Sequence, residues 1–260
     1  MDGGSPRRRP DPEPQSGPDP WADAALAAAL FAVDPVGLGG IALRALPGPV
    51  RDQWLADLRS LLPDTPRRRI PLHVTEGRLL GGLDLAATLK AGRPVAERGL
   101  LAECDGGLVE LAMAERAEGT TVSHLCAALD RGEVVLERDG LAQRLPARLG
   151  VIALDESHEA DEGLAAALVD RLAFITDLTP IGVRDVDEPP FGPAAILAAR
   201  GRLGDVTIDT DRVEALCAAA QARGSDSLRA PLRDVRAARV AAALAGSDTV
   251  TDAELAVAAR

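Results

Sequence analysis

Residues 30–46 read Leu-Phe-Ala-Val-Asp-Pro-Val-Gly-Leu-Gly-Gly-Ile-Ala-Leu-Arg-Ala-Leu, and this stretch decides the fold class. We interpret Leu30–Val33 as a short strand that follows a helix, and the Gly-rich residues 34–40 as a turn. Residues 41–46 then begin the next helix. A strand, a Gly-rich turn and a helix in this order are typical of a P-loop, whose backbone N–H groups hold phosphate at a helix N-terminus.

This turn supplies candidate cofactor-binding residues but lacks a cation. Gly37, Gly39 and Gly40 would present backbone N–H groups to a phosphate. A P-loop also needs a lysine that reaches the outer phosphates, and the one lysine of the chain, Lys90, lies far from the turn. A purely structural tight turn is therefore the alternative interpretation of these glycines.

Short apolar runs continue along the chain and alternate with helical patterns. The runs at Gly107–Ala112, Leu149–Leu154 and Phe174–Leu178 predict buried strands. Gln53–Leu62 predicts an amphipathic helix, and Glu133–Leu145 predicts a hairpin. Alternation of this kind predicts a mostly parallel sheet covered by helices.

The composition divides the chain into four predicted parts. Residues 1–20 are rich in Pro, Gly, Asp and Ser and predict a disordered tail. Residues 21–178 form the α/β core with inserted hairpins. Residues 179–192 are rich in proline and acidic side chains and read as a linker, and the Ala-rich residues 193–260 form a small helical domain.

The overall charge and composition argue against several classes of protein. A net charge of −11 argues against a general nucleic-acid binder, and 2% aromatic residues leave few platforms for stacking bases. No apolar run reaches the roughly 18 residues of a membrane span, so a cytoplasmic location is expected. The three cysteines and three histidines have no metal-ligand spacing, and no metal site is predicted.

Two charged runs have alternative interpretations. Arg67-Arg68-Arg69 could bind porphyrin carboxylates or nucleic acid, and the acidic run 155–162 could attract a cation or a basic partner. For both runs we favour a solvated loop, and for the arginines an interface patch is equally consistent with the pattern.

Several motifs downstream of the Gly-rich turn occur in a characteristic order. They are Leu79–Leu85, Gly99–Ala102, Gly106–Leu108, Gly132–Gly140, Pro146–Arg148, Leu168–Leu172, Ser227–Leu232 and Arg236–Arg239. Each motif is modest alone, but in this order the set resembles the magnesium chelatase family of AAA+ proteins. The resemblance implies an α/β fold: an AAA+ P-loop-type core, with a parallel sheet flanked by helices, and a small helical lid domain.

The resemblance also implies roles for two arginines. Arg171 lies in the segment that carries the family's arginine finger, which would act in trans on ATP held by a neighbouring subunit. Arg229 lies at the position of the sensor 2 arginine. The plainer alternatives are a surface ion pair between Arg171 and Asp170, and an ordinary exposed helix arginine at 229.

Departures from the family pattern indicate which subunit the chain resembles. The P-loop lysine is absent, and no Asp-Glu pair follows the strand near Leu108, where Glu115 is the lone candidate carboxylate. Sensor 1 is normally asparagine, and the sequence contains no asparagine. The three losses together are similar to the D subunit rather than the ATP-hydrolysing I subunit, and imply a non-hydrolysing AAA+ platform.

The implied enzyme is a magnesium chelatase, a ligase that forms nitrogen–metal bonds by inserting Mg²⁺ into protoporphyrin IX for chlorophyll or bacteriochlorophyll synthesis. ATP and Mg²⁺ would be needed at the level of the complex. The implied partners are the I subunit in a mixed ring, and the H subunit with protoporphyrin IX. The D family usually continues into an integrin I-type domain, so the chain is expected to be an amino-terminal portion. An active AAA+ ATPase and an AAA+-like scaffold unrelated to porphyrins are the alternatives.

Overall fold

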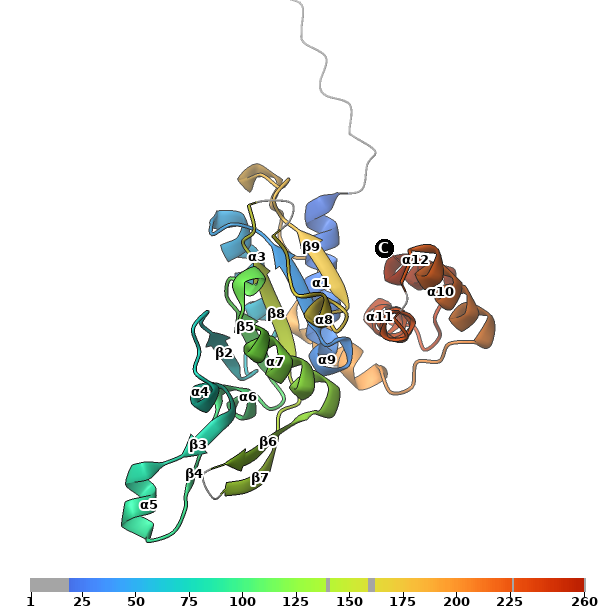
Figure 1. Ribbon diagram of the computed structural model, residues 1–260. Coiled ribbons are helices and arrows are strands. Elements are labelled where there is room, and N and C mark those ends of the chain that lie inside the picture. Colours follow the sequence, from blue (N-terminus) through green and yellow to red (C-terminus); the bar gives the residue numbers. More distant parts are fainter. Residues whose placement is uncertain (1–18, 139–140, 159–161, 226, 260) are drawn as a thin grey trace, which may run out of the picture.

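The computed structural model describes residues 19–138, 141–158, 162–225 and 227–259 (Figure 1). The predicted tail at residues 1–20 therefore lies almost entirely outside the described residues, as does the tip of the predicted hairpin at 139–140. Among the described residues, no helix combines the length and the apolar character that crossing a membrane requires.

A five-stranded parallel sheet forms the centre of the molecule. Its strands lie in the order β2-β5-β8-β1-β9, and every neighbouring pair is parallel. The strands are β1 (Gly40–Arg44), β2 (Arg67–Ile70), β5 (Leu108–Leu111), β8 (Gly150–Asp155) and β9 (Phe174–Asp177). The parallel sheet and the predicted strands at 107–112, 149–154 and 174–178 are confirmed.

Helices cover both faces of this sheet (Figure 1). The helices of the first 180 residues are α1 (Pro20–Val33), α2 (Pro35–Leu38), α3 (Pro49–Leu61), α4 (Glu76–Leu80), α5 (Leu85–Ala91), α6 (Leu100–Glu103), α7 (Gly119–Arg131) and α8 (Ala166–Val169), with the short 3-10 turn η1 (Ala114–Arg116). Successive side chains of a strand point to opposite faces. Accordingly, Ile41 and Leu43 pack into one apolar cluster with α1 and α3, while Ala42 packs into a second cluster on the other face.

Two antiparallel hairpins are inserted into the core. One pairs β3 (Gly81–Leu83) with β4 (Ala96–Arg98) and carries α5 at its tip; the other pairs β6 (Glu133–Arg138) with β7 (Leu141–Pro146). The second insertion confirms the predicted hairpin at 133–145. Both project away from the sheet on the same side (Figure 1).

The prediction for residues 30–46 is wrong in its secondary structure. α1 continues to Val33, and the predicted helix start at Ile41 is β1. The Ala-rich run before Val33 favours a helix, and every residue from Ala27 to Val33 is buried. A continuous apolar run does not distinguish a buried helix from a buried strand by its periodicity.

The arginine run is also not a loop. Arg67, Arg68 and Arg69 lie in β2, which forms one edge of the sheet. Arg68 pairs with Glu103, with 2.8 Å between Nε and Oε2. Charged side chains on an edge strand oppose pairing with a further strand, so the run has a structural role at this edge.

The C-terminal helices pack against the core through apolar contacts and arginines. They are α9 (Pro193–Arg202), α10 (Thr210–Ala222), α11 (Arg229–Ala245) and α12 (Asp252–Ala258), preceded by the 3-10 turn η2 (Val183–Asp185). Their buried side chains share one apolar cluster with α1 and α3. Arg200 caps the end of α1 by donating to the carbonyl oxygen of Ala32 at 2.8 Å, and Arg236 pairs with Asp34. The division at 179–192 stays a prediction, since core and appendage share this cluster.

Trp54 of α3 provides a test of this packing. Its side chain is buried, and Nε1 donates to the carbonyl oxygen of Ala24 in α1 at 2.9 Å. Trp54→Ala should lower the free energy of unfolding by about 3–5 kcal/mol, because it leaves a cavity and removes the hydrogen bond from the indole to α1. Lys90→Ala, at an exposed position of α5, should change it by less than about 0.5 kcal/mol. Urea unfolding followed by circular dichroism measures both, and equal midpoints would contradict the packing of α3 on α1.

Candidate functional site

The turn that could hold a phosphate lies between β1 and α3. Ligands of parallel α/β sheets bind at the carboxyl ends of the strands, and residues 45–48 connect this end of β1 to the N-terminus of α3. Pro47 and Pro49 lie in or directly after the turn, and proline has no backbone N–H. The turn therefore offers fewer donors to a phosphate than a Gly-rich P-loop does.

Gly37, Gly39 and Gly40 lie at the opposite, amino end of β1, so the P-loop assignment to these glycines is wrong. Gly39 has φ +74°, and a Cβ atom there would lie 2.2 Å from the carbonyl oxygen of Arg171. A Cβ atom at Gly40 would lie 2.3 Å from the carbonyl oxygen of Val151. These glycines allow backbone segments to pack closely, which is the structural alternative weighed from the sequence.

A cation does lie beside the true strand–turn–helix, and sequence reasoning missed it. Arg51, in the first turn of α3, directs its guanidinium toward the residue that follows β8. Its Nη1 lies 2.7 Å from Oε1 of Glu156, and the two side chains are only 10% and 18% exposed. Arg51 lies at the start of the helix that follows the turn, which is where a P-loop places its lysine. Here an internal carboxylate neutralises that charge.

Glu115 completes this arrangement from the end of β5. The strand is followed by Ala112 and Met113, and Glu115 lies in η1 with a side chain that is 1% exposed. Its Oε2 accepts a hydrogen bond of 3.0 Å from the backbone N–H of Glu156. Met113 has φ +47°, an uncommon conformation for a residue with a side chain. Glu115 thus supports the chain after β8 and does not face solvent.

The acidic run begins beside this network, so its interpretation as a solvated loop is wrong for residues 155–157, whereas His158 and Glu162 are exposed. Asp155 ends β8 and is buried, and its Oδ1 accepts from the backbone N–H of Ser157 at 3.0 Å. Residues 159–161 of the run lie outside the described residues. No group of side chains suited to a metal ion occurs in the described part of the chain. The network is not fully satisfied, because Nε of Arg51, Oε1 of Glu115 and Oγ of Ser157 are buried without a hydrogen-bond partner among the described residues. The site has no lysine at the turn and no Asp-Glu pair after β5, so its residues do not match the set that holds ATP with Mg²⁺ in a P-loop ATPase.

Arg171 lies in a second cluster of charges, at the contact between the core and α11. Its Nε and Nη2 donate to the two carboxylate oxygens of Asp130 at 2.9 and 2.6 Å. Its Nη1 donates to the carbonyl oxygen of Ala167 at 2.6 Å. The side chain is 13% exposed. The partner of Arg171 is therefore Asp130, at the end of α7, and not the neighbouring Asp170.

Arg229 joins this cluster from the first residue of α11. Its Nη1 donates to Asp170 at 3.0 Å, and its Nη2 to Asp130 at 3.4 Å. Arg233, one turn further, donates to the carbonyl oxygen of Leu38 at 3.2 Å, and burial lowers its pKa to about 10. The structure thus brings together the two arginines predicted from the sequence, and adds Asp130, which the sequence gave no signal to select.

The charge cluster is stable at neutral pH. Hydrogen bonding from Arg171 holds the pKa of Asp130 below its ordinary value, against an opposing effect of burial. The folded pKa lies below the unfolded pKa of about 3.9. The contribution of this pair to stability is therefore present above that value, and is lost as the pH falls through the folded pKa.

Comparison with known proteins places these features in context. No protein-family model matches the chain. The chain is 39% identical to the magnesium-chelatase 60 kDa subunit of Cereibacter sphaeroides, over 91% of this chain and 39% of that protein. It is 30% identical to the 67 kDa subunit of Chlorobaculum parvum, over 89% and 40%. It is 29% identical to the 38 kDa subunit of Rhodobacter capsulatus, over 88% and 80%. The chain thus spans about two fifths of its 60 and 67 kDa relatives.

A solved structure supports the fold independently. The crystal structure of a "putative ATPase" from Cytophaga hutchinsonii matches with a TM-score of 0.65, at 18% identity over 90% of this chain and 82% of that chain. At this identity the match concerns the fold alone. Together with the strand order, it confirms the predicted α/β AAA+ core.

The pair formed by Arg51 and Glu156 is open to a direct test. Arg51→Ala should lower the free energy of unfolding by about 2–3 kcal/mol, because it leaves the carboxylate of Glu156, which is 18% exposed, without its partner. The double variant Arg51→Met/Glu156→Leu should recover most of this loss, since it removes both charges. Chemical denaturation of the purified chain measures the three free energies.

Arg59→Ala is the matched control for this test. Arg59 lies on the same helix, but its pair with Glu110 is more open, with an arginine side chain 47% exposed. Loss of this pair should lower the free energy of unfolding by no more than about 1 kcal/mol. If Arg51→Ala lowers the free energy of unfolding by as little as Arg59→Ala does, the pair of Arg51 with Glu156 does not stabilise this end of the sheet.

Proposed function

The chain is a homologue of the D subunits of magnesium chelatase, and from this premise we propose that it is the non-hydrolysing AAA+ platform of such an enzyme. In this role it assembles with the ATP-hydrolysing I subunit into a mixed ring, and connects that ring to the H subunit with protoporphyrin IX. The complex uses ATP to insert Mg²⁺ into the porphyrin. We place this complex in the cytoplasm.

One observation carries the non-hydrolysing part of this proposal: the ion pair of Arg51 with Glu156 at the β1–α3 turn. Phosphoryl transfer in P-loop ATPases uses a free lysine at the phosphates and a carboxylate that holds Mg²⁺. In this chain the arginine is neutralised internally, and the carboxylate of Glu115 is buried against a backbone N–H. The guanidinium is thus paired with Glu156 and the carboxylate of Glu115 is enclosed in the protein, although Nε of Arg51 and Oε1 of Glu115 have no hydrogen-bond partner in the part of the chain that the structure describes.

Two alternatives predict different behaviour. An active AAA+ ATPase would hydrolyse ATP without a partner, which the paired Arg51 and the enclosed Glu115 disfavour. A scaffold unrelated to porphyrins would not assemble with a chelatase I subunit. The identities to the 60, 67 and 38 kDa chelatase subunits favour the chelatase assignment over this scaffold.

We further propose that Arg171 acts in trans as an arginine finger. A guanidinium has five N–H donors, and Asp130 and Ala167 accept three of them. Two N–H donors of Arg171 remain for the phosphate of ATP bound to a neighbouring subunit. The bidentate pair with Asp130 fixes the orientation of the guanidinium and so the direction of these two donors. Arg229 contacts both Asp130 and Asp170, so we assign it a positioning role on the acceptors of this cluster.

The first expected result concerns ATP turnover. The isolated chain should show no ATPase activity above background, because its turn carries no free cation. Mixed with a 38 kDa-type I subunit, it should elute as a larger complex in size-exclusion chromatography. Glu115→Gln should leave the ATPase activity of that mixture unchanged. Turnover by the isolated chain that Glu115→Gln abolishes would establish an active ATPase instead, and failure to form a complex would favour the unrelated scaffold.

The second expected result concerns Arg171. Arg171→Ala should lower the ATPase activity of the mixture by about tenfold or more, since a finger contributes about 10³–10⁵ at each site it reaches. Complex formation should be retained. Arg171→Lys should restore little, because an ammonium does not reproduce the planar fork.

Arg148→Ala is the matched control for the finger. Arg148 also makes a bidentate pair, with Asp105 at 3.2 Å for both contacts, but at a different surface. It should leave the ATPase activity of the mixture unchanged. If both alanine variants keep full ATPase activity, Arg171 is only a structural partner of Asp130.

A further inference from the structure

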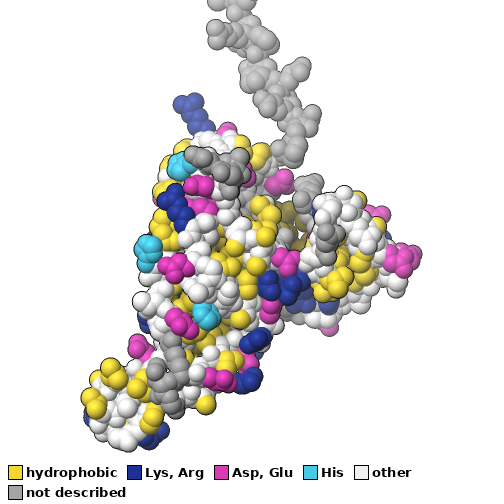
Figure 2. Space-filling model, in the orientation of Figure 1, with side chains coloured by type: hydrophobic (Ala, Val, Ile, Leu, Met, Phe, Trp, Pro, Cys, Tyr) yellow, Lys and Arg dark blue, Asp and Glu magenta, His cyan; other side chains and the backbone are white. Residues whose placement is uncertain are grey.

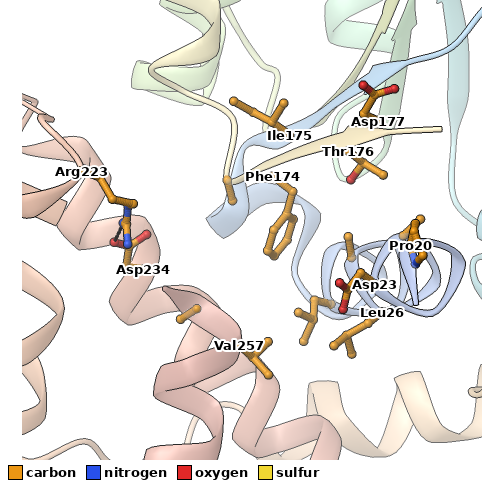
Figure 3. Close-up of a pocket in the computed structure, with 15 residues that line it drawn as sticks. Pro20, Asp23, Leu26, Phe174, Ile175, Thr176, Asp177, Arg223, Asp234 and Val257 are labelled. Atoms are coloured by element: carbon orange, nitrogen blue, oxygen red, sulfur yellow. Dashed lines mark hydrogen bonds and ion pairs between the residues drawn. The ribbon is translucent and has the colours of Figure 1, made fainter. Parts of the chain in front are cut away.

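A groove of about 440 Å³ lies between α1, β9 and the C-terminal helices (Figure 3). It lies along the last strand of the sheet, and none of the residues that line it belongs to the β1–α3 turn at 45–48. Its floor on the sheet side is the continuous segment 173–177. Its other walls come from α1, from α11 and from α12, with Leu26 and Val257 among the apolar side chains.

The groove follows the edge of β9 and not one of its faces. Successive side chains of a strand point to opposite faces, so a groove over one face would contact only alternate residues. Here five consecutive residues line it. In the close-up, Phe174 points toward α1 while Ile175 points away from it (Figure 3). β9 is the last strand in the sheet order, and within the described residues it pairs with β1 alone.

The two edges of the sheet differ in their protection against further pairing. The β2 edge carries Arg67, Arg68 and Arg69, which oppose strand addition. The β9 edge carries Phe174, Ile175 and Thr176, residue types that favour strands. Ile175 is 72% exposed, although it is apolar and lies at the edge. Within the part of the chain that the structure describes, the β2 edge thus carries charged side chains, while no further strand pairs with the β9 edge beside the groove.

The lining of the groove indicates the chemistry of its occupant. Three acidic residues, Asp23, Asp177 and Asp234, line it, against one basic residue, Arg223. Arg223 already pairs with Asp234. Apolar side chains also line the groove, among them Leu26 and Leu30 of α1 and Val257 of α12. An occupant with alternating basic and apolar side chains complements this lining.

We propose that the β9 edge is a docking site for an extended, basic and apolar segment of a partner protein, which adds to the sheet beside β9. Strand addition of this kind gains affinity from backbone hydrogen bonds, and specificity from the pockets for alternate side chains. The site does not involve the β1–α3 turn or Arg171, so it is independent of the function proposed above.

The test uses the full chain and a defined probe, the fluorescein-labelled peptide acetyl-(Lys-Val)4-amide. Fluorescence anisotropy should show saturable binding, and acetyl-(Glu-Val)4-amide should not bind. Ile175→Lys should weaken the binding of the basic peptide at least tenfold. Hydrogen exchange of the amides at residues 174–177 should slow when the basic peptide is added.

Leu197→Lys is the matched control. Leu197 lies on α9 outside the groove and is 71% exposed, so the substitution makes the same charge change at nearly the same exposure. It should leave peptide affinity unchanged. Equal affinities of the two lysine variants, or unchanged exchange at residues 174–177, would overturn the proposal.

Two other occupants are distinguished by the same materials. If deletion of residues 2–18 tightens peptide binding tenfold, the chain's own Arg7–Arg9 segment fills the groove, and the partner proposal is wrong. If sedimentation detects a dimer that Ile175→Lys converts to a monomer, a second copy is the occupant, and the proposal is equally wrong.

Discussion

The ion pair between Arg51 and Glu156 determines what the carboxyl end of the sheet can do. Removing two charges from water is costly, and attraction between them compensates only with close geometry and further hydrogen bonds. The pair has this geometry at 2.7 Å, and the backbone N–H of Glu156 is held by Glu115. Through these contacts α3, β8 and η1 are joined directly. In an ATP-binding relative of this fold, the same three elements would meet around phosphate and Mg²⁺.

The two charge networks lie at opposite ends of β1 and differ in character. The network of Arg51 is enclosed, with exposed fractions of 10%, 18% and 1% for the side chains of Arg51, Glu156 and Glu115. The network of Arg171, Asp130 and Arg229 is more open, with exposed fractions of 13%, 36% and 44% for these side chains. Arg171 itself is about as buried as Arg51, and the greater exposure of its network comes from Asp130 and Arg229.

The sequence predicted the layers of the fold better than it predicted the site. The strands β5, β8 and β9 are short apolar runs bounded by turns, and they were identified at nearly their observed positions. The run before Val33 was assigned to the wrong element, because a buried Ala-rich helix and a buried strand share the same uniform apolar pattern. Because the strand was predicted at residues 30–33, the phosphate turn was expected at the wrong end of β1. For the same reason, Arg51 was not recognised as the residue at the position of the P-loop lysine. Pro49, a typical first residue of a helix, was the available signal for the true start of α3. The pairing of Arg171 with Asp130 spans 41 residues, and no local pattern encodes it.

The attachment of the C-terminal helices has a mechanical consequence. Arg200 and Arg233 donate hydrogen bonds to backbone carbonyl oxygens at the end of α1 and in α2, and Arg236 forms an ion pair with Asp34. The helices α9 and α11 also share an apolar cluster with α1. A hinge between the two parts would have to break these contacts together, so the molecule resists bending at this joint. In the mixed ring that we propose, a subunit that resists bending would not absorb strain produced by its hydrolysing neighbours. A displacement at one of its subunit interfaces would instead be passed on to the other interface.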